Sequence, residues 1–287
     1  MSATCASTLP SDGAHARLPR GDGRAEIVFG PVHGATRLRH LYQRNPCRVF
    51  FPGTTDLATA VVLTTSGGLT GGDRIELDLA VRQEARAVIT TQAAEKIYRS
   101  AGEPCNVDVR ITAGKKTWME WMPQETILFD GARLRRATTV RATDGARIMA
   151  GEILVFGRLA RGEVFRNGAL RDAWTVERDG RRVWMEALRY GAPENVLLEH
   201  PAGMDGARSL ATALYVADDG AQHLETARGL LDGNQSRCAV TCVNGVLVAR
   251  FLARDPWVLR TEYARFWTAF RHAVAGLPAR LPRVWEC

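Results

Sequence analysis

The sequence predicts a mainly β protein of stacked or rolled strand-turn-strand units (β-solenoid-like) with about two α-helices. Three observations support this prediction. Short runs rich in Val, Ile, Thr and Trp are separated by Gly and Asp, which is typical of strands and turns. Similar strand pairs recur at a spacing of about 30 residues, as in repeat architectures. Two segments have the apolar spacing of a helix.

Strands are predicted at 60–63, 75–81, 87–91, 107–111 and 117–121. The repeat matches Val81, Ala87 and Ile89 to Ile111, Thr117 and Met119, and these to Val140, Ala146 and Ile148. Asp179-Gly180 and Asn244-Gly245 follow apolar runs, and both pairs accept the positive φ angles of a type I′ hairpin turn. We therefore expect a hairpin at each pair.

Helices are predicted at about 222–231 and 256–275. The second has a candidate N-cap at Asp255 and proline at its first position, and Gly276 follows its end. Its apolar residues recur at spacings of three and four, which predicts a helix face that packs against a core.

The chain has 287 residues, enough for a sizeable core. Residues 1–24 are rich in Ser, Ala, Pro and Gly and lack an apolar segment, so we expect a flexible leader without a secretion signal. Residues 25–287 are predicted to form one β domain. The sequence lacks the roughly 18 consecutive apolar residues of a membrane helix. These features predict a cytoplasmic protein that does not bind a membrane.

The net charge of +7 comes from arginines that are spread along the chain. Such spacing favours a basic surface that meets an acidic partner over a nucleic-acid-binding stripe. Cys238 and Cys242 lie on one face of a predicted strand, about 13 Å apart at roughly 3.3 Å per residue. That separation is too great for one metal ion, so we expect two buried structural thiols.

Residues 66–163 contain polar positions that a β core does not require. The Gly-rich run at 67–72 precedes a strand and lacks a Lys-Ser/Thr pair, so it predicts a tight turn with Asp73 at a strand start rather than a phosphate loop. Glu95, Glu125, Asp130, Glu152 and Glu163 follow in the same stretch.

Three runs of this stretch resemble the UreD (UreH) family of urease accessory proteins. They are Gly-Gly-Leu-Thr-Gly-Gly-Asp at 67–73, Thr-Thr-Gln-Ala-Ala-Glu-Lys-Ile-Tyr-Arg-Ser at 90–100, and Pro-Gln-Glu-Thr-Ile-Leu-Phe-Asp-Gly-Ala at 123–132. Gly151-Glu152, Arg-Gly-Glu-Val-Phe at 161–165 and Pro-Arg-Val-Trp at 282–285 continue the resemblance, which spans about 25–285.

The resemblance implies a mainly β fold with two helices and a role without catalysis. Members of the family are scaffolds that bind apo-urease and UreF, and UreF recruits the GTPase UreG, which carries nickel. The assembly supports GTP-dependent nickel insertion into urease. A water-filled passage through the family's fold is proposed to let nickel travel towards urease.

A nickel passage needs weak, exchangeable ligands, and carboxylates suit this better than His/Cys clusters. Our hypothesis is that Asp73, Glu95, Glu125, Asp130, Glu152 and Glu163 include inward-facing carboxylates along a wet path. Buried carboxylates need water or a partner such as Arg99, Arg158 or Arg161. We expect nickel in transit and no tightly bound cofactor.

Three other functions remain open from the sequence. The same carboxylates would serve a carboxylate-dependent hydrolase, although no histidine lies between His40 and His200 to act as a general base. The charge of +7 would suit a basic nucleic-acid-binding protein. A metallochaperone with one tight nickel site is the third.

Overall fold

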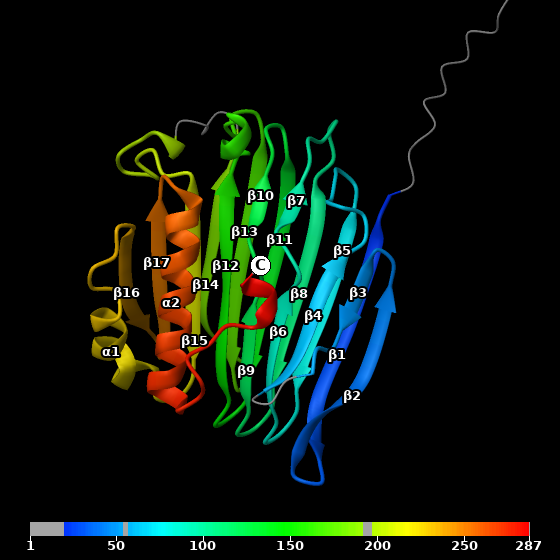
Figure 1. Ribbon diagram of the computed structural model, residues 1–287, viewed down its shortest axis with the longest axis vertical. Helices are drawn as coiled ribbons and strands as arrows, with labels where there is room; N and C mark the ends of the chain where they lie inside the picture. Colours follow the sequence, from blue (N-terminus) through cyan, green and yellow to red (C-terminus); the bar gives the residue numbers. More distant parts are fainter. Residues whose placement is uncertain (1–19, 54–56, 192–196, 287) are drawn as a thin grey trace, which may run out of the picture.

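The computed structural model describes residues 20–53, 57–191 and 197–286, and this part of the chain coils into a β-solenoid of about four turns (Figure 1). Sheet A has the strand order β14-β13-β11-β8-β5-β1-β2. Its strands are β1 (Asp22–Val32), β2 (Ala35–Arg44), β5 (Arg74–Val81), β8 (Cys105–Ala113), β11 (Arg133–Ala142), β13 (Ala169–Arg178) and β14 (Arg181–Tyr190).

Sheet B has the order β16-β17-β15-β12-β9-β6-β4-β3. Its strands are β3 (Cys47–Phe50), β4 (Ala58–Thr64), β6 (Arg86–Thr91), β9 (Trp118–Met122), β12 (Arg147–Phe156), β15 (Ser209–Val216), β16 (Arg237–Val243) and β17 (Val246–Ala253). Two short strands, β7 (Glu95–Ile97) and β10 (Thr126–Leu128), pair with each other beside this path.

Each solenoid turn carries the chain from a strand of sheet A to a strand of sheet B and back. The stacked strands pair in parallel, β5 with β8 and β8 with β11 in sheet A, and β6 with β9 and β9 with β12 in sheet B. Antiparallel strands flank the stack at both ends of each sheet, among them β2 and β14 of sheet A. The predicted architecture of stacked strand-turn-strand units is therefore confirmed.

The predicted repeat has one error of register. Ile111 lies opposite Val140, which confirms the spacing of 29 residues in the second interval. In the first interval Ile111 lies opposite Leu79 rather than Val81, and Met119 lies opposite Ala87. The true offset is longer than the predicted one by two residues. A shift of two keeps every side chain on the same face, so alternation alone does not reveal it.

Both predicted hairpins are present. Asp179 and Gly180 have φ angles of 49° and 76° between β13 and β14. Asn244 and Gly245 have φ angles of 51° and 80° between β16 and β17. The strands are antiparallel in both cases, as the turn residues predicted.

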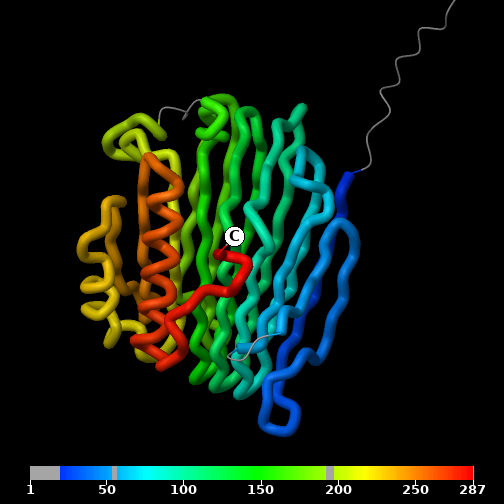
Figure 2. Tube along the Cα trace, in the orientation of Figure 1, coloured from blue at the N-terminus to red at the C-terminus, as the bar shows by residue number. Residues whose placement is uncertain are grey.

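Helix α2 (Pro256–Ala275) covers the outer face of sheet B (Figure 2). Its bounds are those predicted: the Asp255 carboxylate accepts a hydrogen bond of 2.8 Å from the N–H of Trp257, and Gly276 has a φ of 63°. Its buried aromatic residues pack with residues of β15 and β17, so the predicted core face is confirmed. Helix α1 (Leu224–Gly229) is shorter than predicted because residues Gly220–His223 form a 3-10 turn before it.

The leader prediction falls largely outside the structure. Residues 1–19 lie outside the described residues, and β1 begins at Asp22, so residues 22–24 belong to a strand rather than to the leader.

Among the described residues, no helix is long and apolar enough to span a membrane. Cys238 and Cys242 are half-buried rather than buried, because β16 is an edge strand of sheet B.

Candidate functional site

Sheet B is interrupted where the motif-rich runs stack on one another. Residues 92–94 separate β6 from β7, and residues 123–125 separate β9 from β10. Strand β12 continues past both breaks, pairing with β9 up to Ala150 and with β10 from Leu154. Pro123 has no N–H to donate to the ladder, which favours the second break. The break places Gly151 and Glu152 beside the two irregular segments.

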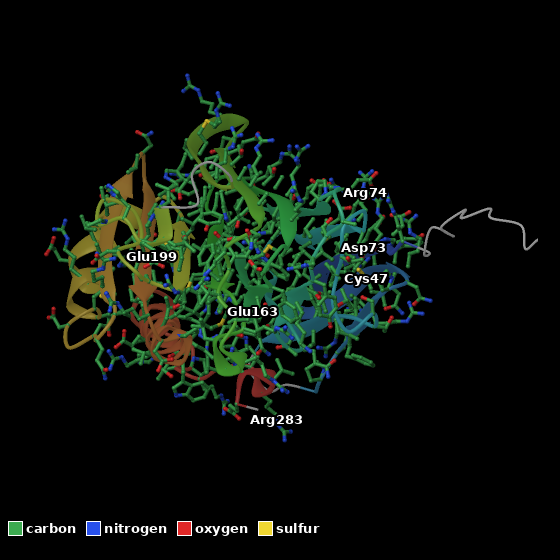
Figure 3. The ribbon with its side chains drawn as sticks, turned by 90° about the horizontal axis from the view of Figure 1, so that it is seen from above. Cys47, Asp73, Arg74, Glu163, Glu199 and Arg283 are labelled. Carbon is green, nitrogen blue, oxygen red and sulfur yellow. The ribbon has the colours of Figure 1, made fainter. Side chains whose placement is uncertain are left out.

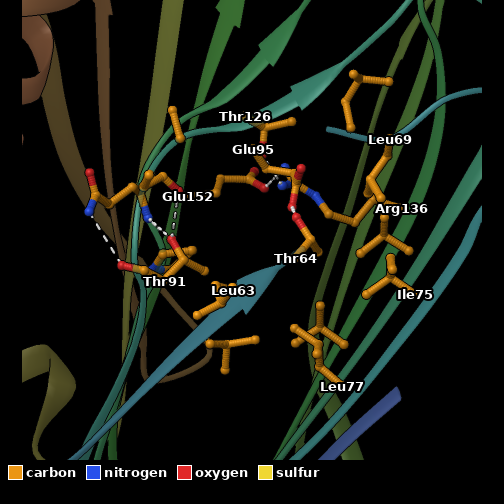
Figure 4. Close-up of a pocket in the computed structure, with 18 of the residues that line it drawn as sticks. Leu63, Thr64, Leu69, Ile75, Leu77, Thr91, Glu95, Thr126, Arg136 and Glu152 are labelled. Atoms are coloured by element: carbon orange, nitrogen blue, oxygen red, sulfur yellow. Dashed lines mark hydrogen bonds and ion pairs between the residues drawn. The ribbon is translucent and has the colours of Figure 1, made fainter. Parts of the chain in front are cut away.

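A cavity of about 270 Å³ lies between the sheets at this break (Figure 4). Exposed residues at its rim are Gly67, Gln92, Ala93 and Lys96, whereas Arg136, Glu152 and Trp174 in its lining are buried. Most of the lining is apolar, including Val62, Leu69, Ile75, Leu77, Val109, Trp121 and Leu134. The few polar groups in this mostly apolar wall are therefore the ones that can bind an ion or exchange a proton.

Arg136 of β11 carries its charge into the cavity lining. Its Nη1 donates a hydrogen bond of 3.1 Å to Oγ1 of Thr126, and its Nε donates one of 3.1 Å to Oδ1 of Asp172. Its Nη2 forms ion pairs with both Glu152 and Asp172. One buried cation thus holds two carboxylates from β12 and β13 together. Ion pairs are one of the few forms in which charges persist in a protein interior.

Two carboxyl groups that line the cavity, those of Glu152 and Glu95, have raised pKa values. Burial raises the pKa of Glu152 above its usual range, Arg136 opposes the rise, and Asp172 adds to it. Burial also raises the pKa of Glu95 on β7, whose carboxylate accepts a hydrogen bond of 2.7 Å from Oγ1 of Thr64. Both groups hold a proton at a higher pH than a solvent-exposed glutamate does.

Two of the six predicted path residues, Glu95 and Glu152, line the cavity. Asp73 is buried beside β5 instead, where its oxygens accept hydrogen bonds from the N–H groups of Gly21 (2.7 Å) and Thr70 (2.8 Å). It closes the Gly-rich turn, as the sequence predicted. Glu125 forms an ion pair of 2.6 Å with Arg260 of α2.

Asp130 and Glu163 meet where the chain crosses from sheet B to sheet A, before β11 and before β13. The N–H of Asp130 donates a hydrogen bond of 2.9 Å to Glu163, and Glu163 pairs with Arg158. The hydrogen bond from Arg158 lowers the pKa of Glu163. The pKa of Asp130 is also lowered, because hydrogen bonds from the N–H groups of Asn167 and Arg166 outweigh the opposing effect of burial. Figure 3 shows Glu163 and Asp73 in different parts of the molecule. The structure therefore does not bring all six carboxylates together.

Sequence reasoning missed Arg136 and Asp172. A signal for both was present. Four buried residues alternate with more exposed ones on β11 (Leu134, Arg136, Thr138 and Val140) and on β13 (Leu170, Asp172, Trp174 and Val176). Period-two alternation places all eight on the buried face. A charged residue at such a position indicates a buried ion pair.

Two buried thiols lie in this region: Cys47 lines the cavity, and Cys105 begins β8. Burial raises the pKa of both Cys47 and Cys105 to about 12, and the nearby Glu95 carboxylate adds to both shifts. Both thiols are therefore neutral at physiological pH and poor metal ligands. Within the described ranges, no three His, Cys, Asp or Glu side chains are grouped so as to hold a metal ion.

The C-terminal segment covers the outside of the break. Trp285 donates a hydrogen bond of 2.9 Å from Nε1 to Oγ1 of Thr90, and the guanidinium of Arg260 lies 4.4 Å from the centroid of the Trp285 ring. The side-chain amide of Gln124 donates to the carbonyls of Gln92 (2.7 Å) and Val284 (2.8 Å). The tail, the two irregular segments and α2 are thereby joined.

Gly151 allows α2 to approach the same place. A Cβ atom at Gly151 would collide with the hydroxyl of Tyr263 and would lie 2.5 Å from the carbonyl oxygen of Thr212. Only glycine fits between β12 and its neighbours here, which gives a structural reason for the Gly-Glu pair in the sequence.

Comparisons with known proteins agree with the resemblance seen in the motifs. The family model described as UreD urease accessory protein matches residues 21–286. A urease accessory protein UreD of Magnetococcus marinus is 41% identical over 288 residues, covering 98% of this chain and 99% of the relative. The UreD of Azorhizobium caulinodans is 40% identical, covering 94% of this chain and 97% of the relative. With a family match over nearly its whole length, this chain belongs to the UreD family of urease accessory proteins.

Proposed function

We propose that this protein acts in urease maturation as a scaffold without a catalytic step of its own. It would bind apo-urease and UreF, with UreG joining through UreF, and support GTP-dependent nickel insertion. Family membership supports the maturation role. We further propose that the cavity between the sheets gives nickel a polar passage.

The observation that carries the passage is the set of oxygen atoms around the cavity. Thr64, Glu95, Thr126 and Glu152 line it, and they come from four different strands of the solenoid. A water needs roughly 10–15 Å³ of such space, so about 270 Å³ holds an ion with several of its waters. The cavity is therefore large enough for a partly hydrated nickel ion.

The ligand chemistry suits transit rather than storage. Nickel binds divalent sites tightly when soft or imidazole ligands surround it, whereas carboxylate and hydroxyl oxygens hold it more weakly. The raised pKa values of Glu95 and Glu152 weaken binding further, because a protonated carboxyl must lose its proton before it coordinates a cation. Nickel could then bind in the cavity and also leave it.

The test is urease activation in a reconstituted host. The cognate urease genes are expressed with UreE, UreF and UreG, with and without this chain, and both ammonia release and nickel per active site are measured. The scaffold role predicts that both fall to background without the chain and return with it. Full urease activity without the chain would reject the role and direct attention to substrate turnover and DNA binding by the isolated protein.

The passage is tested by Glu95→Gln and Glu152→Gln in the same host. Each change keeps the side-chain shape and removes a ligand charge, so we expect less nickel per urease site at equal levels of the assembled complex. Glu177→Gln is the matched control, because Glu177 pairs with Arg141 on the outer face of sheet A, away from the cavity. Normal nickel loading by both cavity variants would remove the passage and leave the scaffold role standing.

A further inference from the structure

Four exposed arginines lie together on the outer face of sheet A. Arg135 on β11 lies directly opposite Arg171 on β13, and Arg171 lies directly opposite Arg189 on β14. Arg133 lies on the same face of β11, two residues before Arg135. Adjacent strands are about 4.8 Å apart, so the three register-matched arginines span about 10 Å. We call these four residues the arginine row.

The arginine row has no counter-charge within the described residues. None of the four side chains takes part in an ion pair or hydrogen bond there. Like charges directly opposite each other on neighbouring strands destabilise a sheet. The row therefore carries a folding cost that nothing inside the described chain offsets.

Other arginines on the same face do have acidic partners. Arg24 lies opposite Glu76 and pairs with it, and Arg110 lies opposite Asp78 and pairs with it at a register-matched position. Arg141 pairs with Glu177 across β11 and β13. At these positions each arginine has a carboxylate partner, whereas the arginines of the row have none among the described residues.

The row borders a surface hollow of about 900 Å³. All four arginines line this hollow, together with residues that include Leu134, Leu170, Gly168 and Tyr190. Guanidinium groups form bidentate pairs with carboxylates, and four of them border this one hollow. The surface is therefore shaped and charged to receive acidic side chains.

We propose that the arginine row is a docking site for an acidic segment of a partner protein, whose Asp and Glu carboxylates lie across β11, β13 and β14. A protein segment fits better than a nucleic acid. Duplex DNA presents one charge per about 1.7 Å along its axis and needs a long basic stripe. Here the row is short, and carboxylates such as Glu76, Asp78 and Glu177 lie on the same face. This site is on the outer face of sheet A and does not depend on the nickel passage.

The test is binding of a fluorescein-labelled decaglutamate peptide to the full chain at low and physiological salt. Arg135→Gln/Arg171→Gln removes two charges from the row, and Arg133→Gln/Arg189→Gln is an independent second variant. Arg110→Gln/Arg141→Gln is the matched control, because it removes two charges from paired positions on the same face. All three variants have the same net charge.

We expect the wild type to bind the peptide in a saturable, salt-dependent manner. Each row variant should weaken binding at least about tenfold, since hydrogen bonds between charged groups are stronger than those between neutral groups. The control should stay within about twofold of wild type because it leaves the row intact. The row variants should also melt at the same temperature as wild type or about 1–3 °C higher, because repulsion is relieved.

Three results would overturn the proposal. Equal losses in the row and control variants would indicate only the general positive charge of the protein. Tighter binding of a 20-base-pair duplex than of the peptide, lost in the row variants, would assign the row to nucleic acid. Absence of saturable peptide binding to the wild type would leave the row without a ligand.

Discussion

Arg136 on β11 lies directly opposite Asp172 on β13, and their side chains form an ion pair inside the solenoid. Both residues are buried, and the same guanidinium also holds Glu152 from the opposite sheet. The cluster of Arg136, Asp172 and Glu152 therefore links sheet A to sheet B across the cavity.

Removing this cation should destabilise the protein strongly. Arg136→Met leaves two carboxylates buried without a counter-charge, and breaking a buried pair in this way costs about 3–5 kcal/mol. The free energy of unfolding, measured by urea denaturation, should fall by that amount. Arg136→Met/Glu152→Gln/Asp172→Asn should recover much of the loss, because no buried charge then remains.

A surface ion pair provides the comparison. Arg110→Met removes an arginine that pairs with Asp78 on the exposed face, where such pairs contribute about 0–1 kcal/mol. Similar losses for Arg110→Met and Arg136→Met would contradict the special status of the interior pair.

The stability of the protein should depend on the proton at Glu152. Burial raises the pKa of Glu152 in the folded state above its ordinary value of 4.5, so between these two values the folded state binds more protons than the unfolded state does. This contribution is fully present below the ordinary pKa and is lost as the pH rises through the folded-state value. Glu95 acts with the same sign because its pKa is also raised.

The free energy of unfolding should therefore fall more steeply between about pH 5 and pH 8 in the wild type than in Glu152→Gln. Urea titrations of both proteins across this range measure the difference. Parallel pH profiles would show that Glu152 keeps an ordinary pKa in the folded protein.

Docking of the C-terminal tail should depend on Trp285. Trp285→Ala removes the bond to Thr90, the contact with Arg260 and the stacking on Tyr263, whose ring centroid is 6.4 Å away. Loss of a buried tryptophan costs roughly 3–5 kcal/mol, equivalent to at least about a hundredfold in an opening equilibrium.

Hydrogen exchange followed by mass spectrometry should show faster exchange in residues 283–286 of Trp285→Ala while α2 remains protected. Glu286→Ala is the control, since Glu286 is exposed and its side chain takes no part in these contacts. Unchanged exchange in Trp285→Ala would mean that Gln124 and Val284 hold the tail by themselves.

The cysteines should differ in reactivity. With a pKa of about 12, Cys47 and Cys105 have about one thiolate in ten thousand molecules at pH 8, and burial shields both sulfurs. Of the four cysteines in the described residues, iodoacetamide should label the half-buried Cys238 and Cys242 before Cys47 and Cys105, as peptide mass spectrometry would measure. Labelling in urea should remove the difference, and equal rates in the native protein would place Cys47 or Cys105 nearer to solvent.

Local signals in the sequence predict much of this fold. The bounds of α2 follow from Asp255, Pro256 and Gly276, because capping and helix-breaking residues act within a few positions. The two hairpins follow from Asp179-Gly180 and Asn244-Gly245 for the same reason. The offset between solenoid turns is a long-range property, and alternation leaves it uncertain by two residues.

The candidate site is less visible in the sequence. Glu95 and Glu152 lie at the cavity, but Asp73, Glu125, Asp130 and Glu163 are held by backbone groups or by arginines elsewhere. A carboxylate in a turn has the same sequence signature whether it caps that turn or faces inward. Only the stacking of residues 92–94 on 123–125 reveals which ones share a cavity.

Gly151 and Glu152 make the wall between helix and cavity a single strand thick. The missing side chain of Gly151 admits Tyr263 of α2 from outside, while the next residue contributes its carboxylate to the inside. Burial raises the pKa of Tyr263 well above its ordinary value, and the charge of Glu152 adds to that rise. A side chain of the outer helix and a carboxylate of the interior are therefore held by two adjacent residues of one strand.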